Sequence, residues 1–249
     1  MLAILGGSGL TELAGLEVKH RQIVRTPYGE PSGPLTFGRL GATDVVFLAR
    51  HGYGHTLAPH EINYRANLWA LHSKGVKRIV AVCSTGGITA RFLPGTLAVP
   101  DQIIDYTWGR RATFFEGAEQ PVVHIDFTHP YDAAMRREIL SAAKDAGIAV
   151  VDGGTYGATN GPRLETAAEI GRLERDGCDL VGMTGMPEAS LARELEMGYA
   201  AIAVVVNFAA GRGASRDGIV LGDLAKTLGD GMNRVRALLV KLVDHDGRS

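Results

Sequence analysis

The chain is poor in cysteine and carries almost no net charge. Cys83 and Cys178 are its only cysteines, and each lies within or beside an apolar run, which favours small buried hydrophobes over a disulfide or a catalytic thiol. Lysine and arginine number 26 against 27 acidic residues, so the net charge is −1. That balance gives no electrostatic footprint for nucleic acid or an anionic membrane. The expected partner is a small molecule.

Long apolar runs are also absent. None reaches the length needed to span a bilayer, and the first residues, MLAILGGSGL, lack the charged region of a signal peptide. We therefore expect a cytoplasmic protein with no membrane partner. Hydrophobic residues make up 45% of the chain, enough for a substantial core, and the length suits one α/β domain over residues 1–249.

Glycine, by contrast, is abundant, with 33 residues that cluster where apolar runs stop. The runs at 2–5, 45–49, 78–83, 96–99, 148–151, 179–182 and 200–206 predict short strands, several of them buried on both faces. Amphipathic stretches predict helices over 59–73, 130–146, 165–176, 187–197 and 223–243. This alternation predicts an α/β/α sandwich, and a hairpin-like stretch over 18–49 predicts a mixed, strongly twisted sheet. The glycine-rich strand ends predict loops that converge on one site.

The densest polar stretch is LARHGYGHTLAPHEINYRANLWAL, which starts at Leu48. Arg50 offers a planar fork suited to phosphate oxygens, and His51 can add a donor; the alternative is a buried ion pair and a core histidine. Histidine phosphatases use a similar Arg-His-Gly string, but on their first strand. His51, His55 and His60 cross a glycine-rich loop without a well-spaced carboxylate, so we expect no metal.

Other strand ends carry groups suited to phosphate, a sugar and a purine. The turn in AILGGSGLTEL fits neither a dinucleotide fingerprint nor a P-loop, which leaves a backbone nest with the Ser8 hydroxyl or a plain tight turn. In GPRLETAAE and VVVNFAAG, Glu165 and Asn207 together would complement a 6-oxopurine, with the carboxylate accepting N1–H and the amide contacting O6 and N7. A helix-start charge and a turn-forming Asn are the alternatives. GMTGMPE supplies Met183 as an apolar plate and the Thr184 hydroxyl, although such a methionine is more often core.

In collinear order these segments resemble the purine nucleoside phosphorylase and methylthioadenosine phosphorylase family over nearly the whole chain. The string RHG…NYRANLWAL is specific to the methylthio branch. The resemblance implies a pentosyltransferase that performs reversible phosphorolysis, releasing a purine and a sugar 1-phosphate. Inorganic phosphate is then a co-substrate, and no cofactor is expected.

The same resemblance assigns roles by position. Those that bind phosphate are Ser8, Arg50, His51, Cys83, Ser84 and Thr184, although the family usually has threonine where this chain has Cys83. Met183 would lie under the ribose. Asn207 would stabilise the leaving base and act with His51 in catalysis. His124 matches a position that enters the neighbouring subunit's 5′ pocket, which implies a homotrimer.

Departures from the family pattern point to the substrate. Methylthioadenosine phosphorylases have aspartate at the positions of Asn207 and Ala209, whereas Asn207 with Glu165 is similar to the 6-oxopurine enzymes. Those enzymes usually follow with a histidine for the 5′-hydroxyl, but here Leu221 and Leu224 supply an apolar wall. We therefore expect S-methyl-5′-thioinosine to yield hypoxanthine and 5-methylthioribose 1-phosphate in purine salvage. The alternatives are a general inosine and guanosine phosphorylase, a methylthioadenosine phosphorylase, a histidine phosphatase and a purine-binding module.

Overall fold

The computed structural model describes residues 1–117 and 121–246. In these ranges the strands form one sheet: β1 (Leu2–Gly6), β2 (Glu17–Gln22), β3 (Leu35–Leu40), β4 (Thr43–Ala49), β5 (Arg78–Gly87), β6 (Leu97–Val99), β7 (Gln102–Asp105), β8 (Val150–Asp152), β9 (Thr155–Ala158), β10 (Leu180–Gly182) and β11 (Gly198–Phe208). Their order is β2-β3-β4-β1-β5-β10-β9-β7, and β11 pairs with β5 and β6, with β8 beyond β6. The sheet is mixed, as predicted, because the antiparallel β2–β3–β4 meander joins the parallel strands β4, β1, β5 and β11.

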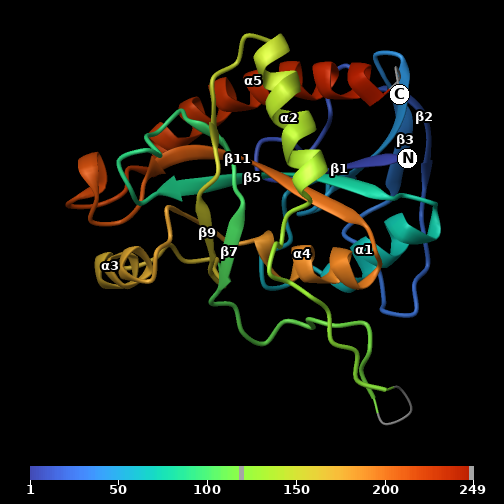
Figure 1. Ribbon diagram of the computed structural model, residues 1–249, viewed down its shortest axis with the longest axis horizontal. Helices are drawn as coiled ribbons and strands as arrows, with labels where there is room; N and C mark the ends of the chain where they lie inside the picture. The colour runs from blue at the N-terminus through green and yellow to red at the C-terminus, as the bar shows by residue number, and fades with distance from the viewer. Residues whose placement is uncertain (118–120, 247–249) are drawn as a thin grey trace.

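Helices cover both faces of this sheet (Figure 1). They are α1 (Tyr64–Ser73), α2 (Ala133–Asp145), α3 (Ala167–Arg175), α4 (Gly185–Glu194) and α5 (Leu221–Asp246). Helices α2 and α5 pack on one face over a core that includes Ile4, Val80 and Ile202. Helices α1 and α4 pack on the other, over Leu48, Ala81 and other core side chains. The predicted α/β/α sandwich is confirmed.

Two local predictions need correction. The helix predicted over 59–73 begins at Tyr64, because the Asn63 side chain caps it by accepting from the Ala66 amide at 3.0 Å. Residues before it form turns that carry the polar loop after β4. Strands β7 and β9 were also missed, since their short sequences, QIID and TYGA, lack a long apolar run. No helix in the described part of the chain combines the length and hydropathy of a membrane span.

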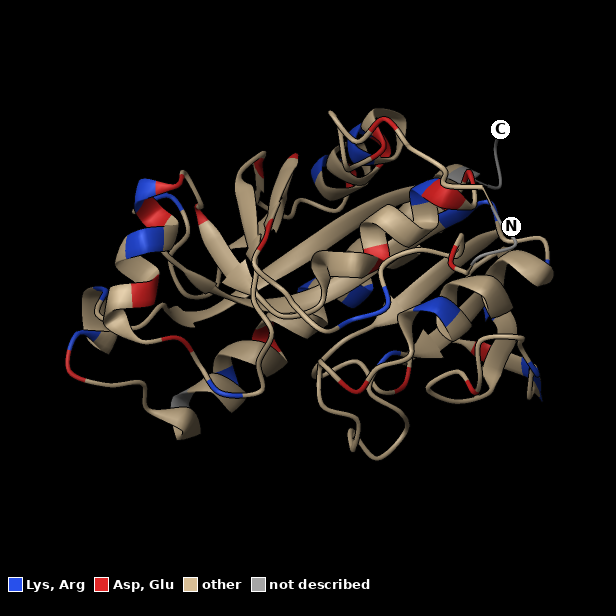
Figure 2. Cartoon of the chain, turned by 90° about the horizontal axis from the view of Figure 1, so that it is seen from below, with Lys and Arg blue, Asp and Glu red and all other residues tan. Residues whose placement is uncertain are grey.

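The central pair of strands positions the site. Strands β5 and β11 run parallel along almost their full length, and the register shifts between Val205 and Asn207. Such a bulge places one extra residue on the strand and re-aims the side chains beside it. Around the outside, Lys and Arg are interspersed with Asp and Glu along the described helices and loops (Figure 2), as the near-zero net charge predicts.

Candidate active site

A cavity opens where the central strands end, which is where ligands bind in α/β sheets. Five strand ends contribute to it. Its lining includes Gly7 and Ser8 after β1, Arg50 and His51 after β4, Cys83 to Gly86 in β5, Met183 and Thr184 after β10, and Val206 and Asn207 in β11. The predicted convergence of glycine-rich strand ends on one site is therefore found in the structure.

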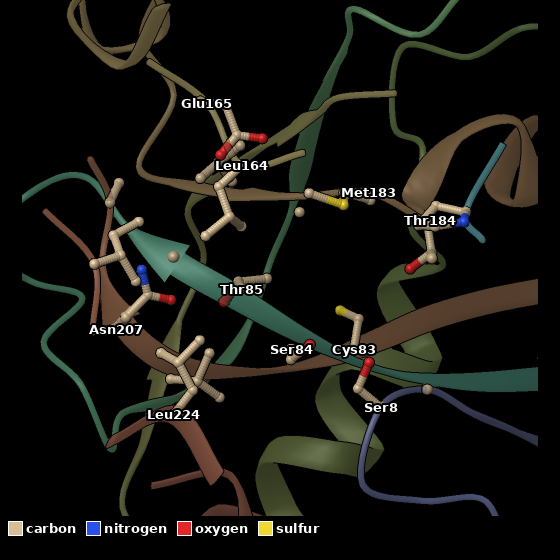
Figure 3. Close-up of a pocket in the computed structure, with 18 of the residues that line it drawn as sticks. Ser8, Cys83, Ser84, Thr85, Leu164, Glu165, Met183, Thr184, Asn207 and Leu224 are labelled. Atoms are coloured by element: carbon tan, nitrogen blue, oxygen red, sulfur yellow. The ribbon is translucent and has the colours of Figure 1, made fainter. Parts of the chain in front are cut away.

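Hydroxyl groups gather at one end of the cavity. Ser8, Ser84 and Thr184 lie there, and the hydroxyls of Ser8 and Thr184 point toward each other (Figure 3). Gly7 is required beside them, since a Cβ at that position would lie 2.5 Å from the Val82 carbonyl oxygen and 3.1 Å from Nη1 of Arg50. The turn after β1 thus lets the backbone approach the arginine closely.

Hydrogen bonds fix the Arg50 side chain beneath this end of the cavity. Its Nε and Nη2 donate to the two carboxylate oxygens of Glu188 at 2.6 and 2.8 Å, and Nη1 donates to the Val82 carbonyl at 3.1 Å. Tyr199 adds a hydroxyl donor to Glu188 at 2.9 Å. Burial opposes the charge of Arg50, but the Glu188 carboxylate offsets this and raises the pKa of Arg50. Among the described residues, these bonds leave two of the five guanidinium N–H groups for a ligand.

His51 offers a lone pair rather than the expected donor. Its Nδ1 lies 2.8 Å from the Leu57 carbonyl oxygen, which can only accept, so Nδ1 carries the proton. Burial and the adjacent Arg50 charge lower the pKa of His51 to about 4. At neutral pH the ring is uncharged, and Nε2 is an acceptor. The His55 ring lies beside it at 4.5 Å, with Nε2 of His55 3.5 Å from the Ser8 hydroxyl.

Cys83 contributes a thiol to the floor of the same end. Its sulfur lines the cavity and lies 3.8 Å from the Ile202 carbonyl, to which it donates. Burial raises the pKa of this thiol to about 12. The group therefore stays protonated and is a weak donor rather than a nucleophile.

Glu165 and Asn207 lie at the opposite end (Figure 3). The bulge in β11 lets consecutive residues, Val206 and Asn207, both line the cavity, whereas a regular strand would alternate their faces. Nδ2 of Asn207 donates to the Phe208 carbonyl at 2.6 Å. This bond turns Oδ1 toward the cavity.

Between the two ends lies the Met183 side chain (Figure 3). The loop after β9 packs against it at Gly161, whose φ is +62° and whose added Cβ would approach the Met183 sulfur to 2.4 Å. Leu224 from the start of α5 and Ile219 from the preceding loop form an apolar part of the wall. The cavity thus has a hydroxyl-rich end, a thioether plate and a carboxylate–amide end.

Two predicted residues lie elsewhere. Leu221, expected beside Leu224, is 67% exposed and lines a neighbouring cavity with Pro162 and Gly218. It is the first residue of α5 and lies at the helix start that borders the neighbouring cavity. His124 is exposed on the arm between β7 and α2, and it is not among the residues that line this cavity.

Sequence reasoning missed three positioning residues: Glu188, Tyr199 and Thr159. Glu188 lies within a predicted amphipathic helix, and its partner Arg50 is 138 positions away in the chain, so no local pattern signals the contact. Tyr199 starts an apolar strand and gives no local signal. Thr159 donates to Glu165, a contact that depends on tertiary structure.

Known proteins are similar to this chain in sequence and in fold. The model of the phosphorylase superfamily matches residues 1–244. The chain belongs to the phosphorylase superfamily. A probable S-methyl-5′-thioinosine phosphorylase of Xanthomonas campestris pv. campestris is 56% identical over 87% of this chain and 86% of that protein. A 6-oxopurine nucleoside phosphorylase of Pyrococcus furiosus is 49% identical over 84% and 80% of the two chains.

Solved phosphorylase structures agree with the fold. Methylthioadenosine phosphorylase from Schistosoma mansoni, in complex with adenine, superposes with a TM-score of 0.95 at 31% identity, covering 100% of this chain and 92% of that one. The superfamily match also decides against the histidine phosphatase alternative, because Arg50 and His51 follow the fourth strand of a phosphorylase fold.

Proposed function

We propose that this phosphorylase cleaves S-methyl-5′-thioinosine with inorganic phosphate, giving hypoxanthine and 5-methylthioribose 1-phosphate. The single observation that carries the proposal is that the carboxylate of Glu165 and the amide of Asn207 line the same end of the cavity (Figure 3). A carboxylate accepts the N1–H that 6-oxopurines have and 6-aminopurines lack. The names of the Xanthomonas and Pyrococcus relatives support the same base class.

Phosphate is assigned to the hydroxyl-rich end. Its oxygens would accept hydrogen bonds from the remaining N–H groups of Arg50, from hydroxyls and from backbone amides; the side chains assigned to it are Ser8, Arg50, His51, Cys83, Ser84 and Thr184. Hydrogen phosphate also carries one proton, and the Nε2 lone pair of His51 can accept a hydrogen bond from it. Phosphate is the one co-substrate in this proposal, which assigns no cofactor or metal.

The chemistry needs no covalent enzyme intermediate. A phosphate oxygen forms a bond to C1′ as the C1′–N9 bond breaks, and the electron pair of that bond stays on the purine. Charge then develops as a ribosyl cation, which the phosphate anion stabilises, and as an electron-rich base. Asn207 stabilises the base by hydrogen bonding at N7 and O6, while the proton from hydrogen phosphate ends on the released hypoxanthine. Met183 lies under the sugar.

The 5′ substituent is assigned to the apolar wall. Leu224 and Ile219 line the cavity without a charged or hydroxyl group of their own, which suits a methylthio group better than a hydroxyl. We further propose a homotrimer in which His124 of one subunit enters the 5′ pocket of the next. Its exposure on the arm between β7 and α2 supports that role. We also propose that this phosphorylase works in the cytoplasm, in purine salvage.

A general 6-oxopurine phosphorylase is the second candidate, favoured by the similarity to the Pyrococcus protein. The test is a panel of inosine, methylthioinosine, methylthioadenosine and adenosine, each with and without phosphate, with free base measured by chromatography. Phosphate-dependent release that is fastest from methylthioinosine supports the proposal. Equal or faster release from inosine would favour the general enzyme, and base binding without turnover would leave a purine-binding module.

A further inference from the structure

Thr159 holds the carboxylate that faces the base. Its Oγ1 lies 2.6 Å from Oε1 of Glu165 and 3.3 Å from the carbonyl oxygen of Gly182. A hydroxyl has a single hydrogen to donate. The shorter contact, to an ionised oxygen, is the stronger of the two, so the hydrogen points at Glu165.

The backbone around Thr159 is fixed independently of this bond. The Thr159 amide donates to the Gly182 carbonyl of β10 at 2.8 Å. Nη2 of Arg110 donates to the carbonyls of Thr159 and Asn160 at 3.4 and 2.9 Å. Gly161, two residues after Thr159, packs against Met183. The backbone that carries the Thr159 hydroxyl is therefore held in a fixed position.

Glu165 is anchored on its other side as well. Helix α3 begins directly after it with a capping box, in which Thr166 and Glu169 each accept a hydrogen bond from the other's backbone amide, at 3.1 and 2.7 Å. Glu165 is half-buried at this junction. Its carboxylate thus sits between a fixed donor and the cavity.

We propose that Thr159 is a positioning residue that keeps Glu165 as a hydrogen-bond acceptor and so selects 6-oxopurines over 6-aminopurines. The Thr159 hydrogen bonds to one carboxylate oxygen of Glu165 and holds the carboxylate in place. The second oxygen then meets N1–H of hypoxanthine but repels the lone pair on N1 of adenine. Sites built around such a polar match discriminate strongly, because the wrong ligand leaves buried groups unpaired. This inference rests on the proposed function and names a determinant of its base specificity.

The test compares Thr159→Val, which removes the donor at nearly constant shape, with Thr159→Ser, which keeps it. The readout is kcat and KM for methylthioinosine and methylthioadenosine at saturating phosphate. In Thr159→Val we expect the kcat/KM ratio of the two substrates to fall about tenfold, mainly through a raised KM for methylthioinosine. Thr159→Ser is expected to stay within about threefold of the wild-type ratio.

A matched control is available at Thr89, whose hydroxyl donates to a carboxylate oxygen of Asp179 at 2.9 Å outside the cavity. Thr89→Val removes the same kind of bond, and its substrate ratio should equal that of the wild type. An unchanged ratio in Thr159→Val, or a Thr159→Ser variant that behaves like Thr159→Val, would overturn the inference. Thr159→Ala replaces the valine variant if that chain does not fold.

Failure of the proposed function can be distinguished from failure of the inference about Thr159. If wild-type protein releases no hypoxanthine from methylthioinosine with phosphate, the proposed function is wrong. Thr159 is then tested by calorimetric binding of hypoxanthine and adenine to the wild type and the same variants. A hypoxanthine preference that weakens about tenfold in Thr159→Val supports its role; a preference that does not change contradicts it.

Discussion

Arg50 and Glu188 form a bidentate ion pair in which the two side chains are only 1% and 0% exposed. Arg50 is the one arginine among the described residues that line the cavity, and the pair cancels most of its charge. It also fixes the direction of the remaining N–H groups, because Nε and Nη2 are both engaged. In the proposed site, phosphate would therefore be held by oriented donors more than by net positive charge.

Glu188→Gln tests this relationship. Loss of the carboxylate leaves Arg50 without its counter-charge, which is expected to lower the free energy of unfolding by about 3 kcal/mol. KM for phosphate should rise at the same time, because the guanidinium can rotate away from the cavity. Urea unfolding and phosphate titration measure the two effects. Tyr199→Phe, which removes one donor to Glu188 and keeps the ion pair, should show a smaller change in both, and the reverse order would refute this role for the pair.

The low pKa of His51 predicts a pH dependence of stability. Its pKa is about 4 in the folded protein against an ordinary value of 6.5. Between these values the unfolded chain binds the extra proton, so this residue lowers the free energy of unfolding as the pH falls from 6.5 toward 4. Denaturant unfolding at pH 7 and pH 5 measures the effect. His51→Gln should show a shallower dependence on pH, and an equally steep one would mean that His51 does not contribute.

Much of the fold follows from local patterns in the sequence. The runs around Ile4, Val46 and Val80 are apolar on both faces, as buried parallel strands require. The place of Arg50 on the cavity wall was also predictable, because the residue directly follows the apolar strand β4. The bulge that turns Asn207 into the cavity could not be foreseen, since it depends on pairing with β5.

Contacts between distant segments were beyond sequence reasoning for a related physical reason. Glu188 meets Arg50 across 138 positions of the chain, and no local periodicity reports such a pairing. Leu221 is the converse case. Its apolar pattern with Leu224 predicted a place in the 5′ wall, but its side chain is largely exposed and lines a neighbouring cavity.

Cys83→Thr tests the thiol at the hydroxyl-rich end. A threonine hydroxyl is a stronger donor to phosphate than the protonated thiol, so KM for phosphate should fall by a few-fold while KM for the nucleoside stays the same. The buried wild-type thiol, with its pKa raised to about 12, should also react slowly with a maleimide at pH 8. Fast modification that is blocked by phosphate would contradict the protonated state.

Asn207→Asp tests the amide at the base end. The new carboxylate would lie against the Phe208 carbonyl that now accepts from Nδ2, and it could no longer donate to O6 of hypoxanthine. We expect kcat/KM for methylthioinosine to fall about a hundredfold, while methylthioadenosine, with its 6-amino donor, loses less. Parallel kinetics with both substrates measure the shift. An unchanged ratio removes Asn207 from base selection.

Leu224→Ser tests the 5′ wall. A hydroxyl in place of the isobutyl group weakens the apolar contact with a methylthio substituent, so the preference for methylthioinosine over inosine should fall about tenfold. Leu221→Ser is the matched control, because that side chain lies outside the cavity and is largely exposed. Equal effects of the two substitutions would show that the change is not local to the 5′ group.

The most direct measurement is a competition in one vessel. Equimolar methylthioinosine and methylthioadenosine are incubated with the wild-type protein and phosphate, and hypoxanthine and adenine are separated by chromatography over the first few per cent of reaction. Because both substrates meet the same enzyme, the initial product ratio equals the ratio of their kcat/KM values. The predicted result is that hypoxanthine exceeds adenine at least tenfold and that neither base forms without phosphate. Adenine in excess would contradict the assignment of Glu165 and Asn207 to a 6-oxopurine.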